Sequence, residues 1–323
     1  VYDRAGLALS AAEKDALRAE RDGYWRFQLD QKRTEWTDGI LGPVSIDTAS
    51  VSDPVLIRAD GQILYTFASS VDDVDMDVTH IVRGADHVTN TATQIQIMQA
   101  MGGTPPAFAH HSLLTGAQGE GLSKRLGTLS LRDLRAAGVA KEALLSLMAR
   151  LGSSQPVELR MTLDEIADGF DLSQFGAAPT KFDAEDLWPL TRERNQHLPF
   201  AAVRDRIAAL GVPADKAERF WAVASKNITK LDDLGHWWAL CRDGAAPIVA
   251  DEDRDFVAQA LSMLPQPPFS DTTWADWTNA VKDATGRKGK ALFMPLRLAL
   301  TGEKSGPEMA ELMPLLQKVP AVK

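Results

Sequence analysis

The apolar residues beyond about Ser130 recur with helical spacing, and this periodicity constrains the fold more than any other feature of the sequence. Apolar positions recur every three or four residues, and glycine or proline interrupts the pattern at short intervals. We therefore expect the back half of the chain to be entirely α-helical. The expected helices cover residues 141–151, 183–194, 201–210, 214–226, 231–241, 251–264, 274–284, 292–300 and 307–317.

The first third of the chain mixes the signals of strands and helices. Runs of apolar and β-branched residues predict strands over residues 43–46, 55–58, 62–67 and 78–82. The Asp60-Gly61 pair predicts a hairpin turn between the second and third of these runs. Helices are expected over residues 11–20, behind the capping residue Ser10, and over residues 91–101. A strand followed by a helix predicts an α/β layer.

Length, charge and cysteine content exclude several classes of protein. The 323 residues carry 35 Lys and Arg against 44 Asp and Glu, a net charge of -9, which excludes a uniformly basic coat for nucleic acid but not local contacts with tRNA. The single cysteine, Cys241, excludes an intrachain disulfide and a cysteine-based zinc site, and it favours a cytoplasmic location. No apolar run approaches the ~20 residues of a membrane span, so no membrane association is expected.

A glycine-rich segment over residues 116–123 resembles a phosphate-binding P-loop. Leu122 stands where that motif requires lysine, so the P-loop interpretation fails. The segment leads instead into Ser123, Lys124 and Arg125, where two adjacent cations would suit a polyphosphate held by charge. Taken alone, such a segment is more often a solvated basic loop.

Arg83 directly follows the predicted strand 78–82. This position corresponds to the carboxyl end of a strand, which is where α/β proteins bind their ligands. A buried guanidinium there is expected to form a forked contact with a carboxylate. A salt bridge to one of the nearby aspartates is an equally good interpretation of the residues alone.

The sequence predicts no metal site. Asp73 and two later aspartates fall on the first, third and fifth positions of a calcium loop, but the sixth position is Val78 rather than glycine. None of the six histidines, including the adjacent His110 and His111, has a glutamate at the spacing of a helical metal site. Packing or surface roles are therefore expected for all six.

Residues 286–304 form a locally basic segment in this acidic protein. Its cations are Arg287, Lys288, Lys290, Arg297 and Lys304, against the single acid Glu303. With the neighbouring aromatic residues Trp274, Trp277 and Phe293, the segment could bind single-stranded nucleic acid through phosphate contacts and base stacking. A solvated basic turn beside core aromatic residues is the plainer alternative.

Three segments together resemble bacterial glutamyl-tRNA synthetase, a class I aminoacyl-tRNA synthetase. The first extends from Asp60-Gly61 through the run Thr-His-Ile-Val-Arg-Gly-Ala-Asp-His at residues 79–87. The second is Leu-Ser-Lys-Arg at 122–125, which resembles the KMSKS signature loop, and the third is Gly-Lys-Ala-Leu-Phe-Met-Pro-Leu-Arg at 289–297. The resemblance implies an α/β, partial Rossmann-type nucleotide-binding region followed by a mostly α-helical C-terminal half, in a multidomain protein.

The resemblance also implies substrates and site residues. The protein would use ATP with Mg2+ to convert L-glutamate to glutamyl-adenylate, then transfer the glutamyl group to tRNA(Glu), acting as a monomer without zinc. Glutamate would contact Arg83, Tyr65 and Ser69, a position where some members have Asn. Lys124 and Leu122 would bind ATP, and Lys124, Ser123 and Arg125 would serve catalysis. tRNA would be bound by Arg287, Lys288, Lys290 and Arg297.

The resemblance begins inside the family's acceptor-stem-binding insertion, and the segment with the His-Ile-Gly-His motif is not found in this sequence. Residues 1–60 would be the remainder of the insertion, 61–118 the second half of the Rossmann domain, 119–200 the stem-contact region and 201–323 the anticodon-binding domain. We expect this chain alone to be inactive. A non-enzymatic tRNA-binding module is the alternative; a shorter relative that glutamylates a tRNA base is disfavoured by the long helical half.

Overall fold

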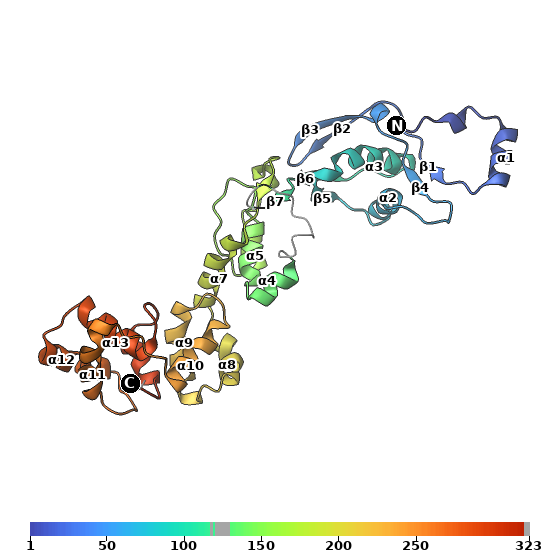
Figure 1. Cartoon of the computed structure of the whole chain (residues 1–323). Coiled ribbons are helices and arrows are strands. Elements are labelled where there is room, and N and C mark those ends of the chain that lie inside the picture. The colour runs from blue at the N-terminus through green and yellow to red at the C-terminus, as the bar shows by residue number, and fades with distance from the viewer. Residues whose placement is uncertain (117–118, 120–129, 320–323) are drawn as a thin grey trace. The chain divides into compact units, whose positions relative to one another are not determined.

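The structure is a computed structural model of the whole chain, and it describes residues 1–116, 119 and 130–319 (Figure 1). These residues divide into two compact units. The first contains residues 1–116, 148–157 and 166–183, and the second contains residues 130–147, 158–165 and 184–319. Mixed sheets with helices characterise the first unit and helices characterise the second, so the predicted fold class is confirmed.

A four-stranded sheet in the order β3-β2-β6-β5 organises the first unit. Its strands are β2 Arg33–Asp38, β3 Gly42–Asp47, β5 His80–Gly84 and β6 Ala107–His111. β2 and β3 pair antiparallel, whereas β6 is parallel to both β2 and β5. Residues on β2 alternate between exposed and inward-facing positions, which is the period of a strand with one face covered.

Helix α3, Val88–Ala100, connects β5 to β6 and makes a βαβ unit of parallel strands. It packs on β2 and on α2, Tyr65–Asp75, and residues 91–98 are all buried. A helix that is buried almost all round lies between other elements of a core. Figure 1 shows α3 alongside the sheet, with α2 next to it.

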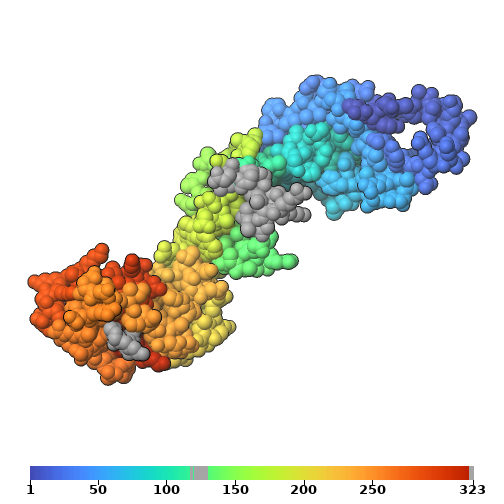
Figure 2. Space-filling model, in the orientation of Figure 1, coloured from blue at the N-terminus to red at the C-terminus, as the bar shows by residue number. Residues whose placement is uncertain are grey.

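The remaining elements of the first unit are short. They are β1 Trp25–Arg26, β4 Val55–Ile57, β7 Leu114–Thr115, β8 Thr180–Lys181 and helix α1 Ala11–Glu20. As predicted, Ser10 caps α1, through a capping box with Glu13. No residue of α1 is buried, and Figure 2 shows an opening between the N-terminal residues and the rest of this unit.

Two predicted strands differ from the structure. The predicted strand 62–67 is wrong, because α2 begins at Tyr65; Phe67, Val71 and Val74 recur at helical spacing, and this face packs against α3. The strand predicted over 78–82 is shifted to His80–Gly84 and is not buried, since Val82 is 53% exposed. β5 pairs only with β6 among the described residues, so it is an edge strand.

The second unit is helical. Its longer helices are α7 Leu187–Gln196, α8 Phe200–Ala209, α9 Ala214–Ala224, α10 Asp233–Asp243, α11 Arg254–Ser262, α12 Thr273–Thr285 and α13 Lys290–Thr301. Three shorter helices complete the described set: α4 Leu131–Ala137, α5 Lys141–Met148 and α14 Met309–Leu312, while α6, Leu163–Ala167, has residues in both units. Each of the nine ranges predicted as helix beyond Ser130 contains an α-helix, although the range 307–317 holds only the short α14 and a 3-10 helix after it. Helices α4 and α6 were not predicted, and the short strand β8 shows that this half is not entirely α-helical.

A single hydrophobic cluster extends from α8 to the residues after α14. Phe220 and Trp238 are its largest fully buried side chains, and their rings meet edge to face at 5.5 Å between centroids. Such a core explains why the helical periodicity of this region is so regular. Within the described residues, no helix has the length and hydrophobicity needed to cross a membrane.

Candidate functional site

Three polar side chains lie at the carboxyl ends of three neighbouring strands. Asp38 is the last residue of β2, Arg83 is the fourth of five in β5, and His110 is the fourth of five in β6. Arg83 and His110 are register partners in the parallel pair, and Asp38 pairs with Phe108 on the other side of β6. This is the edge of an α/β sheet at which ligands bind.

The Arg83 guanidinium is held by neutral polar groups. Its Nη2 donates to Thr91 Oγ1 and to Gln94 Oε1, both at 2.7 Å, and its Nε donates to His110 Nε2 at 3.3 Å. Arg83 forms no ion pair with a carboxylate in the described part of the chain, so the salt bridge to a nearby aspartate is not formed there. The two N–H groups of Nη1 make no hydrogen bond among the same residues and remain for a ligand.

His110 and Asp38 form a fully buried pair. The His110 Nδ1 lies 2.5 Å from Asp38 Oδ2, and both side chains are 0% exposed. Asp38 Oδ1 accepts hydrogen bonds from the backbone N–H groups of His110, Ile40 and Leu41. Burial alone would raise the pKa of Asp38, but these hydrogen bonds outweigh it and lower the pKa to about 2. Asp38 is therefore ionised at neutral pH.

The other two predicted glutamate contacts lie on α2. Tyr65 is the first residue of that helix and is 56% exposed, and its ring meets the His87 ring edge to face at 6.0 Å. Ser69 lies one turn later, and its Oγ accepts a hydrogen bond from Gln94 Nε2 at 2.9 Å. Gln94 therefore connects Ser69 to Arg83 through the two ends of its side-chain amide, because Nε2 donates to Ser69 and Oε1 accepts from Arg83. The substrate roles of Tyr65 and Ser69 stay predictions.

The predicted signature loop, with Leu122, Ser123, Lys124 and Arg125, lies outside the described residues. Its roles in ATP binding and catalysis therefore stay predictions. Within the described part of the chain, no three metal-binding side chains come together to hold a metal ion.

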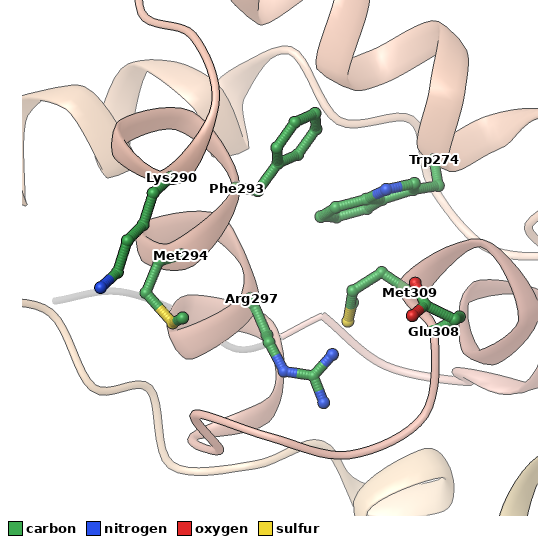
Figure 3. Close-up of a pocket in the computed structure, with 7 residues that line it drawn as sticks. All are labelled: Trp274, Lys290, Phe293, Met294, Arg297, Glu308 and Met309. Carbon is green, nitrogen blue, oxygen red and sulfur yellow. The ribbon is translucent and has the colours of Figure 1, made fainter.

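A second candidate site is a cavity of about 350 Å³ in the helical unit. It is lined by Trp274, Lys290, Phe293, Met294, Arg297, Glu308 and Met309 (Figure 3). The rings of Trp274 and Phe293 lie on one side of this cavity, 6.2 Å apart between centroids, and Phe293 is 45% exposed. Aromatic faces next to cations are the features that bind nucleobases and phosphates. Trp277, by contrast, is a core residue whose indole donates to Ala260 O.

The four predicted tRNA-binding cations differ in what they contact. Lys288 and Lys290 are exposed. Arg287 pairs with Asp253, covers the Phe256 ring at 4.0 Å and donates to Ala291 O at 3.4 Å. That carbonyl would otherwise lack its helical partner, because the residue four positions on is Pro295. Arg287 thus supports α13 in addition to any role in binding.

Arg297 is half-buried and holds the loop that follows α13. It donates from Nε to Glu303 O at 3.2 Å and from Nη1 to Pro307 O at 2.8 Å. Burial lowers the pKa of Arg297, and the nearby carboxylates of Glu308 and Glu303 oppose this. Gly306 adopts a φ of +145° beside this side chain, and a Cβ there would come within 2.7 Å of Arg297 Nη2. tRNA binding by Arg297 stays a prediction.

Sequence reasoning missed four residues around Arg83: Asp38, Thr91, Gln94 and His110. His110 was assigned a packing or surface role, whereas the structure places it in the hydrogen-bond network of Arg83. Asp38 and His110 are 72 residues apart, so no local spacing links them. The sequence gives a weak indication of a polar role for Thr91 and Gln94, because both are polar residues on the apolar side of a predicted helix.

Comparison with known proteins supports this description. Residues 1–189 match the family model of the catalytic domain of class I tRNA synthetases (E and Q), which is more than half of the chain. The chain belongs to this family. Residues 247–321 match the model of an anticodon binding domain, as expected of a class I synthetase with a helical C-terminal region. The predicted resemblance is therefore confirmed.

The relatives of this class I synthetase chain include glutamate–tRNA ligases. It is 75% identical to glutamate–tRNA ligase 1 of Paracoccus denitrificans over 322 residues, which are 99% of this chain and 73% of that protein. It is 74% identical to glutamate–tRNA ligase 2 of Cereibacter sphaeroides, with the same coverage. The crystal structure of a glutamate tRNA ligase from Elizabethkingia meningosepticum in complex with its amino acid is 25% identical, with a TM-score of 0.79 over 96% of this chain and 68% of that one.

Proposed function

We propose that this synthetase chain carries out the ATP-dependent ligation of glutamate to tRNA(Glu). The observation that carries the proposal is the 75% identity to a glutamate–tRNA ligase over 99% of the chain. The carboxylate-binding chemistry of Arg83 and the aromatic and basic cavity of the helical unit support it independently.

The proposed reaction has two steps. The α-carboxylate of glutamate attacks the α-phosphorus of MgATP, which forms glutamyl-adenylate and breaks the α–β phosphoanhydride bond to release pyrophosphate. A ribose hydroxyl at the 3′ end of the tRNA then attacks the acyl carbon, and AMP leaves. Because a carboxylate is already ionised at neutral pH, the first step requires mainly alignment and neutralisation of phosphate charge. We assign the charge neutralisation to Lys124.

Arg83 would select the amino acid in this reaction. Its Nη1, which has no hydrogen-bond partner among the described residues, lies at the carboxyl edge of the sheet, where it can donate to the side-chain carboxylate of glutamate. An uncharged side-chain amide could not form an ion pair with the guanidinium. Tyr65 and Ser69, on the neighbouring helix α2, would line the same pocket.

The proposal for residues 1–323 by themselves is that they bind tRNA and do not form glutamyl-adenylate. The supporting observation is the half-exposed Val82 on edge strand β5, next to Arg83, because an apolar side chain on an unpaired edge is typical of a surface that another segment covers. The chain spans about 73% of the length of the Paracoccus denitrificans ligase that it matches. Glutamate-dependent ATP–pyrophosphate exchange, measured with tRNA present, is expected to stay at background for this chain.

The positive control is a chimaera in which this chain replaces the 322 matching residues of the Paracoccus denitrificans ligase. We expect the chimaera to exchange pyrophosphate and to charge tRNA with glutamate. Exchange by residues 1–323 alone at the rate of the chimaera would contradict the proposed inactivity. An inactive chimaera that still binds tRNA would instead favour a tRNA-binding module without enzymatic activity.

Lys290 tests the proposed tRNA surface. Because it is exposed at the rim of the cavity in Figure 3, Lys290→Ala should remove one phosphate contact, which weakens tRNA binding and lowers the slope of log K against log salt by about 1. Fluorescence anisotropy of labelled tRNA over a series of salt concentrations measures both quantities. Lys226→Ala is the matched control, since Lys226 is exposed but pairs with Glu311 and does not line the cavity. Equal slopes for the two variants would contradict the assignment.

Arg297→Ala in the same titration separates binding from support of the loop. If Arg297 contacts phosphate, the salt slope falls as it does for Lys290→Ala. If it acts only through the carbonyl oxygens of Glu303 and Pro307, the affinity and slope are unchanged, and Arg297 is removed from the binding face.

A further inference from the structure

We propose that His110, held by Asp38, is a positioning residue that orients the Arg83 guanidinium for the side-chain carboxylate of the amino-acid substrate. The inference rests on the proposed function, because it assigns a task to Arg83. It goes beyond that function by giving a role to two residues that have no contact with substrate in the proposal.

The geometry behind the proposal is a chain of contacts along the carboxyl edge of three strands. The order β2-β6-β5 places Asp38, His110 and Arg83 on neighbouring strands, and the register of the parallel pair sets Arg83 directly beside His110. From Asp38 Oδ2 to His110 Nδ1 is 2.5 Å, and from His110 Nε2 to Arg83 Nε is 3.3 Å. The imidazole thus lies between a buried carboxylate and the guanidinium.

The hydrogen bonds assign a tautomer to His110. An arginine Nε–H can only donate, so His110 Nε2 must accept and carries no proton. The ring proton is therefore on Nδ1 and is donated to Asp38 Oδ2. The low pKa of Asp38 agrees with this assignment, since an ionised carboxylate only accepts. A protonated Nε2 could donate to Thr91 Oγ1, 2.9 Å away, but it would leave the Nε–H of Arg83 facing a donor.

This arrangement leaves Arg83 ordered before the substrate arrives. His110 holds Nε, and Thr91 and Gln94 hold the two N–H groups of Nη2, so three of the five donors of the guanidinium are used. The two donors of Nη1 remain, in a fixed direction. Because the side chain does not have to be ordered on binding, more of the interaction with a carboxylate contributes to affinity. The negative charge of Asp73, which interacts electrostatically with Arg83, also offsets the cost of holding a cation in the protein.

Asp38→Asn is the sharpest test, because the backbone determines which way the new amide faces. Asp38 Oδ1 accepts from three backbone N–H groups, so the carbonyl oxygen of Asn must take that place and its NH2 group must face His110 Nδ1. The imidazole then has to accept at Nδ1 and carry its proton on Nε2. Arg83 loses its acceptor and meets a donor.

The expected spectroscopic result is an exchange of tautomers. Two-bond 1H–15N correlation spectra of residues 1–323 with labelled histidine, near pH 8, should show the Nδ1–H form of His110 in the unsubstituted chain and the Nε2–H form in Asp38→Asn. A His110→Gln spectrum assigns the signal by its disappearance. An Nε2–H form of His110 in the unsubstituted chain would overturn the proposal.

Kinetics of the chimaera supply the functional readout. With ATP and tRNA saturating, Asp38→Asn and His110→Ala should raise KM for glutamate by about 10- to 100-fold, the range of a lost hydrogen bond to a charged group, and leave kcat within about threefold. KM for ATP should not change. His110→Gln should recover part of the loss, because its amide oxygen can accept from Arg83 Nε in place of the ring nitrogen.

Asp53→Asn is the matched control. Asp53 is also a buried aspartate of the first unit, but its partner is Arg4, so this variant reports loss of a buried ion pair without loss of the Arg83 network. Equal KM values for Asp38→Asn and Asp53→Asn would overturn the proposal. Failure of the proposed function is distinguishable, because the unsubstituted chimaera would then not charge tRNA with glutamate, or Arg83→Gln would leave KM for glutamate unchanged.

Discussion

Replacing Arg83 by glutamine in the chimaera is expected to lower kcat/KM for glutamate about a hundred- to a thousandfold. The side-chain carboxylate of the substrate would lose its counter-charge in a partly buried site, and removal of one partner of such a pair costs about 3–5 kcal/mol. One factor of ten corresponds to about 1.4 kcal/mol, so the lower part of this range already gives two orders of magnitude. The discrimination between glutamate and glutamine should fall in parallel, since an amide loses less than a carboxylate does.

Two further variants make the Arg83 result specific. Arg83→Lys keeps the charge but has no Nε–H for His110 and no planar fork, so it should recover only part of the activity. Arg58→Gln removes an exposed arginine of the same unit whose partner is Gln62, and it should leave kcat/KM unchanged. A loss for Arg58→Gln as large as that for Arg83→Gln would mean that Arg83 has no specific role in binding glutamate.

Trp238→Ala is expected to lower the free energy of unfolding of the helical unit by about 3–5 kcal/mol, the range for large aromatic side chains removed from a core. Trp238 is 2% exposed and packs edge to face on Phe220, so its removal leaves a cavity in the close-packed core between the helices. Urea titration followed by circular dichroism at 222 nm measures the change, because this unit contains most of the helix.

Trp238→Phe separates packing from hydrogen bonding at this position. The indole Nε1 is buried without a partner among the described residues, so phenylalanine removes an unpaired donor while it keeps most of the ring. We expect a loss well below that of Trp238→Ala. Equal losses for the two variants would show that the indole N–H has a partner that contributes to stability.

Periodicity predicted the helices from α7 to α14, but it missed the short helices α4 and α6 and gave the wrong structure for one short apolar run. Each helix from α8 to α14 buries one face in a common core, so apolar residues recur every three or four positions there and the pattern is visible in the sequence. Residues 62–67 were predicted as a strand from their composition, but Tyr65–Asp75 is a helix because its apolar face packs on α3. A run of six residues is too short for its period to decide between the two.

The candidate site was predicted in part, and the reason lies in the distances along the chain. The sequence indicated Arg83 because a cation after an apolar strand is a pattern of neighbouring residues. His110 and Asp38 were missed because their contacts join residues that are far apart in the sequence. A histidine followed by a histidine, and an aspartate before a glycine, are ordinary patterns. Only the pairing between strands brings these residues next to Arg83.

The sequence by itself determined the family, the α/β and then helical organisation, and the position of Arg83 at the carboxyl end of a strand, because motifs and periodicity are properties of neighbouring residues. Only the tertiary structure decided which groups hold Arg83 and which of its nitrogens remains for a ligand. Strands that are dozens of residues apart come into register through backbone hydrogen bonds, and that register sets Asp38, His110 and Arg83 side by side.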